Sequence, residues 1–231
     1  MMSQYIAIIV ILGGRKMIVK YWSDYACPFC YIGETSLKQA VSNLGMSDDV
    51  QFEMKAFELE PDGSKHYEGS TAERYSRKYG YTLEETQEKI ENINARGKAI
   101  GLDMHYDKSR FTNTFDAHRI TKLAQSKGNS EMVFTLQERL FEAYFSESLE
   151  LANHAVLIKL ASESGLSAQE VQEVLLTDRY AADVRRDEME ARANNIHGVP
   201  FFVINDKYAI PGALSVEQME SVLRKLLEVK E

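Results

Sequence analysis

The sequence predicts an α/β fold in which a long helical segment interrupts one small sheet-containing unit. Two observations support this prediction. A strand–helix–strand pattern occupies residues 17–57, and two β-rich runs followed by a helix occupy residues 198–229. Between them, residues 71–193 contain no proline and are rich in Glu, Lys, Gln, Ala and Leu, which is typical of several packed helices.

The first part of the split unit begins with a short strand over residues 17–22, MIVKYW. A helix is expected over residues 28–43, and Gly45 should end it. Residues 50–57, VQFEMKAF, alternate apolar and polar side chains over part of their length, which predicts a second strand. We assign residues 17–65 to this part of the α/β domain.

The helical insertion is assigned to residues 66–193, and the α/β domain resumes over residues 194–231. In GVPFFVINDKYAIPGA, residues 198–213, two β-rich runs flank the pair Asn-Asp, which predicts a hairpin. The last helix is expected from residue 216 to residue 229, because Ser215 and Gln218 have the spacing of a capping box.

The composition limits the classes of function. The chain has 231 residues, of which 44% are hydrophobic, so it can form one large domain or a domain with an insertion. Its formal net charge is −8, and it therefore lacks the basic surface that favours nucleic acid or an anionic membrane. We predict neither partner. The oligomeric state is not determined by the sequence, and a homodimer is one option.

Residues 1–16 form an N-terminal extension that we expect to lie outside the fold. Its apolar run, YIAIIVIL at residues 5–12, is far shorter than the roughly 20 residues that a transmembrane helix needs. No Lys or Arg precedes this run, and GGRK follows it where a signal peptide would have small residues. The expected location is therefore the cytoplasm.

Both cysteines of the chain lie in SDYACPFCYIG, residues 23–33. Their spacing fits half of a zinc site, a structural disulfide or a redox pair. Zinc would need two further ligands, but the five histidines are scattered singly. A disulfide that closes so short a loop would stabilise the fold little. The redox interpretation is favoured, and no metal site is predicted.

The spacing of the cysteines also suits thiol exchange. If Cys27 lies at the start of the helix, the unpaired N–H groups and the helix dipole stabilise its thiolate. Cys30 then lies one turn inside and is more buried. Pro28 suits the first helical position, where its missing N–H costs nothing. We predict that Cys27 is the nucleophile and Cys30 the resolving thiol, with Pro28 and Phe29 as their immediate support.

Together these segments resemble the cytoplasmic FrnE-like proteins of the DsbA family, a branch of the thioredoxin superfamily described as dithiol-disulfide oxidoreductases or isomerases. The resemblance covers nearly all of residues 17–231. It is carried by SDYACPFCYIG (23–33), KAFELEPD (55–62), NTFDAHRI (113–120), FEAYFSESLELAN (141–153) and GVPFFVINDKYAIPGA (198–213). It implies a thioredoxin-like fold with a large inserted α-helical domain. The chain departs from the family in its Pro-Phe dipeptide and in having no second cysteine pair.

The resemblance also implies roles for residues outside the cysteine pair. In the superfamily, the proline equivalent to Pro200 follows a cis peptide bond and faces the cysteines, so Val199 and Pro200 are expected to support the active site. Asn113 and His118 are expected to line a substrate pocket beside the thiols. Asn113 could instead cap a helix, and His118 could be an ordinary packed histidine. For Asp24, a role in satisfying a turn N–H is favoured over proton transfer.

The predicted function is a thiol-disulfide oxidoreductase or isomerase that acts on a disulfide or thiol of a protein or small molecule. This chemistry requires no metal or organic cofactor, and glutathione is a candidate co-substrate. A kappa-type glutathione transferase, or an enzyme like 2-hydroxychromene-2-carboxylate isomerase, is one alternative, and Cys30 distinguishes it because such enzymes need no resolving thiol. The other alternative is a chaperone-like peptide-binding module, which would stay active without either cysteine.

Overall fold

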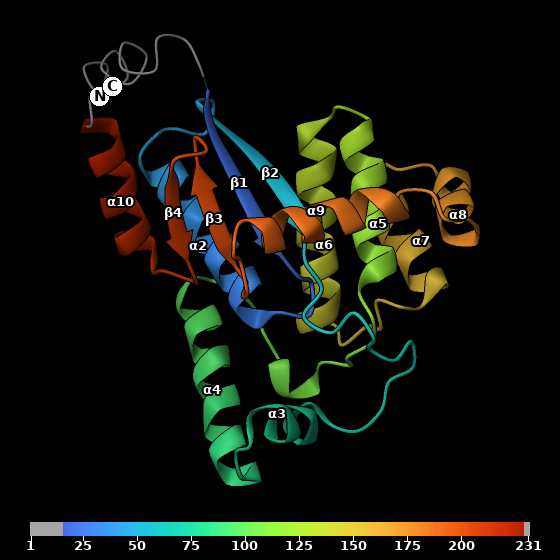
Figure 1. The fold of residues 1–231 in the computed structure, drawn as a ribbon. Coiled ribbons are helices and arrows are strands. Elements are labelled where there is room, and N and C mark those ends of the chain that lie inside the picture. Colours follow the sequence, from blue (N-terminus) through green and yellow to red (C-terminus); the bar gives the residue numbers. More distant parts are fainter. Residues whose placement is uncertain (1–15, 229–231) are drawn as a thin grey trace.

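The computed structural model describes residues 16–228 and shows a four-stranded sheet surrounded by helices (Figure 1). The strand order is β2-β1-β3-β4. The strands are β1 (Met17–Ser23), β2 (Val50–Ala56), β3 (Phe201–Ile204) and β4 (Tyr208–Pro211). Strand β1 is parallel to β2 and antiparallel to β3, which is antiparallel to β4. The sheet thus joins the two distant parts of the sequence, as the split pattern predicts.

Two helices pack together beside this sheet. Helix α2 (Pro28–Asn43) connects the parallel strands β1 and β2, and α10 (Val216–Glu228) packs against α2. The capping box before α10 is formed, because the Ser215 N–H donates to Gln218 Oε1 at 2.9 Å and the Gln218 N–H donates to Ser215 Oγ at 3.3 Å. Asn205 and Asp206 both have positive φ, as a tight hairpin turn requires.

Seven α-helices and one 3-10 turn lie between β2 and β3. They are α3 (Thr71–Tyr79), α4 (Leu83–Ala99), the 3-10 turn η1 (Tyr106–Lys108), α5 (Phe115–Ser126), α6 (Ser130–Phe145), α7 (His154–Glu163), α8 (Ala168–Leu176) and α9 (Ala181–Ala193). Helices α3 and α4 form one group below the sheet, whereas α5 to α8 lie beyond its β2 edge (Figure 1). Helix α9 contacts β2 directly, although the sequence places it in the insertion. The domain boundaries stay predictions.

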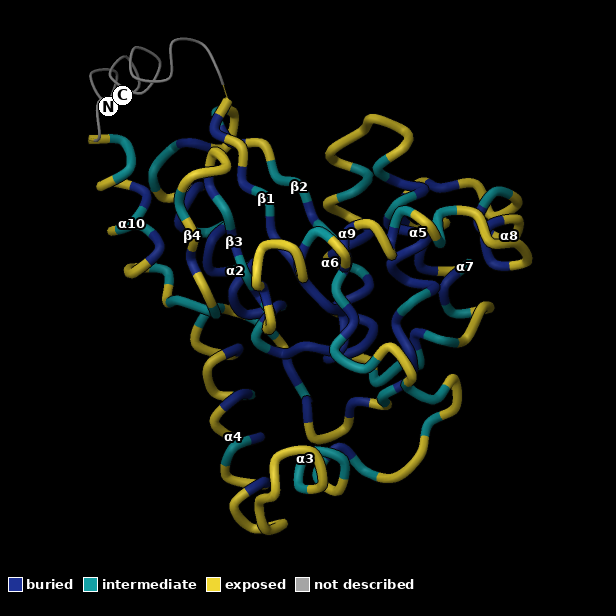
Figure 2. Tube along the Cα trace, viewed as in Figure 1, coloured by how far each residue is buried: buried dark blue, intermediate teal, exposed yellow. Residues whose placement is uncertain are grey.

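The alternation of side chains along β1 distinguishes the two faces of the sheet. Val19 and Tyr21 are buried in the main core, which includes residues of α2. Ile18 on the opposite face is exposed, but Trp22 on that face is buried against Ala191 of α9. Buried residues are concentrated in β1, α2, α5 and the second half of α6, whereas much of α3 and α4 is exposed (Figure 2). Helix α9 therefore covers the end of β1 that leads into the cysteine segment.

Some sequence expectations concern the ends of the chain. Residues 1–15 and the last residue of the predicted 216–229 helix lie outside the described residues. The first strand is one residue longer than predicted and ends at Ser23. No helix between residues 16 and 228 combines the length and apolar character needed to cross a membrane.

Candidate active site

Cys27 is the N-cap residue of α2, and Pro28 begins the helix. The Cys27 side chain makes no capping hydrogen bond, but its C=O accepts the N–H of Cys30 at 3.0 Å. Both thiols are free and buried, with Cys27 3% exposed and Cys30 0% exposed. The structure therefore places one thiol at the start of the helix and the other one turn inside.

A loop that enters β3 faces Cys27. Its Val199–Pro200 peptide bond is cis, and Cys27 Sγ lies 3.6 Å from the Val199 carbonyl oxygen. The Pro200 C=O accepts the N–H of Gly212 at 2.8 Å, which links this loop to the segment after β4. On α2, a Cβ at Gly33 would lie 3.0 Å from Pro200 Cγ and 3.3 Å from Ala213 Cα. Glycine at this position therefore allows helix and loops to meet closely beside the thiols.

The two thiols differ in their surroundings. Burial raises the pKa of Cys30 well above its ordinary value, and the neighbouring Cys27 thiol acts in the same direction. A thiol that stays protonated is a poor nucleophile. The raised pKa of Cys30 agrees with the expected order of attack, and the role of Cys27 as nucleophile stays a prediction.

A buried carboxyl group lies one further turn along α2, at Glu34. Ser23 Oγ donates a hydrogen bond to Glu34 Oε1 at 2.5 Å, and Glu34 Oε2 has no hydrogen-bond partner among the described residues. Burial raises the pKa of Glu34 to about 6, although the ammonium of Lys38 opposes this effect. The sequence analysis did not identify this residue, because the spacing of a single Glu on a helix does not reveal its burial.

We expect Glu34→Gln to stabilise the protein above about pH 6. Because the folded-state pKa is raised, ionisation of Glu34 opposes folding: this cost is absent below the ordinary value of 4.5 and complete above about 6. The difference corresponds to about 2 kcal/mol. Glutamine keeps an acceptor for Ser23 without the charge. Urea unfolding should show the variant gaining about 2 kcal/mol over wild type between pH 4 and pH 8, and a pH-independent difference would contradict this explanation.

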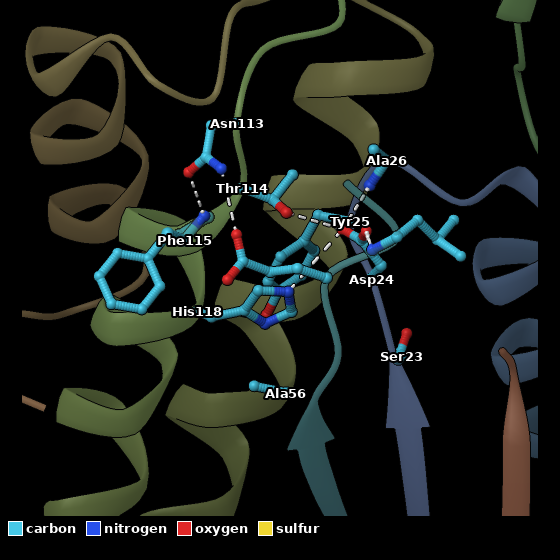
Figure 3. A network of polar contacts seen from close by, with 12 residues as sticks. Ser23, Asp24, Tyr25, Ala26, Ala56, Asn113, Thr114, Phe115 and His118 are labelled. Carbon is cyan, nitrogen blue, oxygen red and sulfur yellow. Dashed lines mark hydrogen bonds and ion pairs between the residues drawn. The ribbon is translucent and has the colours of Figure 1, made fainter. Parts of the chain in front are cut away.

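Asp24 organises the turn between β1 and α2 (Figure 3). Its Oδ2 accepts the N–H of Leu59 at 2.7 Å. Its Oδ1 accepts the N–H of Ala26 at 3.1 Å and the hydroxyl of Thr114 at 2.8 Å. The backbone C=O of Asp24 also accepts the N–H of Cys27 at 3.0 Å. The structure thus shows the turn role that the sequence favours for Asp24.

His118 packs beside this turn and is 1% exposed. Its Nε2 lies 3.8 Å from Asp24 Oδ1, and its ring centroid lies 5.0 Å from that of Tyr25 (Figure 3). Burial alone would raise the pKa of Asp24, but His118 and the N–H groups of Leu59 and Ala26 outweigh burial and lower it. His118 therefore packs against the turn before Cys27, and its Nε2 has no hydrogen-bond partner among the described residues.

Asn113 is also buried, at the start of α5. Its Nδ2 donates to Glu58 Oε2 and to the Pro61 C=O, each at 3.1 Å. Its Oδ1 accepts the N–H of Phe115, the first residue of α5, at 2.9 Å, whereas the N-cap residue of this helix is Thr114 (Figure 3). These contacts are internal to the protein. A role of Asn113 and His118 in a substrate pocket stays a prediction.

A groove of about 850 Å³ lies at the opposite end of α2 from Cys27. It is lined by the C-terminal half of α2, by β2 and by the start of α6, including Lys38 and Phe134. The Lys38 ammonium packs 3.7 Å from the centroid of the Phe134 ring. The sequence analysis missed this groove, because its walls come from segments far apart in the chain.

The fold and the cysteine pair define a class of protein. A dithiol at the start of the helix after β1, opposite a cis-proline loop that enters an antiparallel strand, is the arrangement expected for a thioredoxin-fold thiol-disulfide protein. Residues 18–224 match the DSBA-like thioredoxin domain family, and the chain belongs to this family. The DsbA-family resemblance of the sequence and the predicted fold are thereby confirmed.

Solved structures agree with this assignment. A probable DsbA oxidoreductase from Streptomyces coelicolor is 31% identical, with a TM-score of 0.86 over 93% of this chain and 92% of that one. A cytosolic disulfide reductase, DsbM, from Pseudomonas aeruginosa with GSH is 13% identical, with a TM-score of 0.61 over 92% of this chain and 100% of that one. A 2-hydroxychromene-2-carboxylate isomerase is 13% identical, with a TM-score of 0.65 over 90% and 95%. The last two share the fold alone.

Proposed function

We propose that the protein is a FrnE-like thiol-disulfide oxidoreductase or isomerase that acts in the cytoplasm on disulfides of proteins or small molecules. The position of Cys27 at the N-terminus of α2, with Sγ 3.6 Å from the Val199 C=O, carries this proposal. An extended substrate that paired with the backbone of Val199 would bring its disulfide to Cys27. Membership of the DSBA-like family supports the same chemistry.

The reaction follows from the order of the two thiols. The Cys27 thiolate attacks one sulfur of the substrate disulfide, forms a mixed disulfide and expels the other sulfur as a thiolate, which takes up a proton. Cys30 then loses its proton and attacks Cys27 Sγ, which releases the second substrate thiol. The substrate gains two electrons and the Cys27–Cys30 pair is oxidised. We propose that two molecules of glutathione reduce the pair again and leave as glutathione disulfide. This chemistry uses no metal or organic cofactor.

The glutathione transferase or isomerase alternative shares the fold, so the fold does not separate it from dithiol exchange. The buried Cys30 one turn after Cys27 favours dithiol exchange, because the alternative class has no use for a resolving thiol. A chaperone-like module would not depend on either thiol.

Equilibration in glutathione buffers, followed by alkylation of free thiols, tests the proposal. We expect Cys27 and Cys30 to form a disulfide with a reduction potential of about −180 to −230 mV, the range of isomerases and glutaredoxins. Insulin reduction and refolding of scrambled ribonuclease then distinguish reductase from isomerase. If no glutathione ratio oxidises the pair, the proposal fails. If a variant lacking both cysteines prevents the aggregation of an unfolded protein as well as wild type does, the chaperone alternative is favoured. If Cys30→Ser catalyses the reaction of glutathione with an aryl electrophile, the transferase alternative is favoured.

We expect Phe29→His to make the pair more oxidising. Phe29 is half-buried between the cysteines and cannot donate a hydrogen bond to sulfur. A histidine could donate one or carry a positive charge, which would stabilise the thiolate and therefore the reduced form. Because a tenfold change in equilibrium constant is about 30 mV, we expect an upward shift of roughly 30 to 60 mV.

The glutathione equilibration measures this shift, and Phe29→Leu is the matched control that removes the ring without adding a donor. The leucine variant should remain close to wild type. An equal shift in both variants would show that loss of the phenyl ring, and not the imidazole donor, changes the potential.

A further inference from the structure

Arg96 is a cation that contacts the dipeptide between the cysteines. It lies in the last turn of α4 and is exposed to solvent. Its guanidinium carbon is 5.2 Å from the centroid of the Phe29 ring, a cation–π distance. Its Nη2 donates a hydrogen bond to the Ala213 C=O at 3.1 Å. One side chain of the inserted helices thus contacts both α2 and the loop after β4.

The contacts of Arg96 with Phe29 and Ala213 are both made to segments that lie next to the active site. Phe29 directly precedes Cys30, so the guanidinium lies near the N-terminus of α2, where Cys27 is the N-cap residue. Ala213 follows Gly212, whose N–H binds the Pro200 C=O at 2.8 Å. The positive charge of Arg96 is therefore at the rim of the surface that holds Cys27 and the cis-proline loop.

Several N–H donors of the Arg96 guanidinium make no hydrogen bond within residues 16–228. A guanidinium carries five N–H donors, and the structure assigns one of those of Arg96, to Ala213. Seven other arginines between β2 and β3 pair with carboxylates: Arg74, Arg110, Arg119, Arg139, Arg179, Arg185 and Arg186. Within residues 16–228, no carboxylate forms an ion pair with Arg96. Its fork geometry and charge match a carboxylate, which it can bind through two parallel hydrogen bonds.

Such a cation matters in this chain because the overall charge is unfavourable for anionic substrates. The formal net charge of −8 repels small anions at a distance. The positive charge of Arg96 over Phe29 would offset this repulsion for a substrate that carries a carboxylate close to its sulfur. A neutral disulfide would gain nothing from it.

We propose that Arg96 is a specificity-determining residue that binds a carboxylate of glutathione, the reductant proposed above, so that the pair exchanges faster with glutathione and its disulfide than with neutral thiols and disulfides. Oxidation of the reduced protein by glutathione disulfide is the reverse of that recycling step and reports the same contact. This inference rests on the proposed exchange at Cys27. Reduced protein attacks one sulfur of glutathione disulfide, and one glutathione leaves as a thiolate and takes up a proton. Cys30 then displaces the second glutathione, so that two glutathione molecules and an oxidised pair result.

Single-turnover oxidation of the reduced protein tests this inference without a further reductant. Glutathione disulfide and the neutral bis(2-hydroxyethyl) disulfide are mixed with wild type, and the loss of free thiols is followed by quenched alkylation. We expect Arg96→Gln to lower the second-order rate constant with glutathione disulfide about tenfold and to leave that with the neutral disulfide within about twofold. Arg96→Lys should be intermediate, because it keeps the charge without the planar fork.

Lys98→Gln is the matched control, since Lys98 is an exposed cation in the same last turn of α4. It should leave both rates within about twofold of wild type. Added salt should reduce the preference of wild type for glutathione disulfide and should have little effect on the selectivity of Arg96→Gln. A purely structural role of Arg96 would not produce this salt-dependent selectivity.

The outcomes separate the inference from the proposed function. If wild type reacts with the neutral disulfide and Arg96→Gln lowers the rate constants with both disulfides equally, or lowers neither, the inference is wrong. The proposed exchange at Cys27 then still stands. If wild type reacts with neither disulfide, the proposed exchange fails and the inference fails with it.

Discussion

Replacement of Cys27 by serine is expected to abolish disulfide exchange. Cys27 occupies the N-cap of α2, and its sulfur lies 3.6 Å from the Val199 carbonyl oxygen. A hydroxyl group at this position is not deprotonated at neutral pH and cannot form a mixed disulfide. Insulin reduction by the variant should fall to the uncatalysed rate, while its urea unfolding stays close to that of wild type.

Cys30→Ser is the informative partner of this variant, because it should allow attack and prevent resolution. We expect a mixed disulfide between Cys27 and the substrate to accumulate, with one equivalent of substrate thiol released and no further turnover. Intact-mass spectrometry of the quenched reaction detects this adduct. An adduct on Cys30 in the Cys27→Ser variant, and none in Cys30→Ser, would reverse the assigned roles.

The sheet could be predicted from the sequence because its strands carry local signals. The β-rich run before Asn205 and Asp206 and the one after it become β3 and β4, and both turn residues adopt the positive φ that this pair favours. The position of α9 could not be predicted in this way. Its contact with β2 depends on the three-dimensional path of the chain after β2, which the periodicity of a helix does not encode.

In the candidate site, too, the residues with a local sequence signal could be predicted, and those placed by long-range packing could not. Cys27, Pro28 and Cys30 could be placed at the start of α2 because their spacing is a local property of the chain. The cis peptide at Val199–Pro200 was expected only through the family resemblance. Arg96 could not be found, because nothing in the sequence of α4 distinguishes it from neighbouring cations until the helix is packed against Phe29.

Asp187 connects α9 to the sheet, and Asp187→Ala is expected to destabilise the protein by about 3 to 5 kcal/mol. The Asp187 side chain is 6% exposed; its Oδ2 accepts the N–H of Ala56 at 2.8 Å and pairs with Lys122. Its Oδ1 lies 3.7 Å from the Lys55 ammonium. Alanine would leave the backbone N–H and the largely buried Lys122 ammonium without this partner, which costs more than the loss of an exposed ion pair.

Two controls make this expectation specific. Asp187→Asn retains an acceptor for the Ala56 N–H but removes the charge, so its loss of stability should be intermediate. Asp183→Ala removes a more exposed ion pair, that with Arg186, one turn before Asp187 on the same helix, which should cost less than about 1 kcal/mol. Urea unfolding measures all three. Similar small losses for Asp183→Ala and Asp187→Ala would show that the contact of α9 with β2 does not depend on this carboxylate. The Asp187 backbone C=O also accepts the indole N–H of Trp22 at 3.0 Å, so α9 is bonded to the residue before Ser23. If Asp187→Ala shifts α9, the turn between Ser23 and Cys27 should shift with it. The rate of disulfide exchange by Cys27 in Asp187→Ala should then fall at urea concentrations below those that unfold the protein.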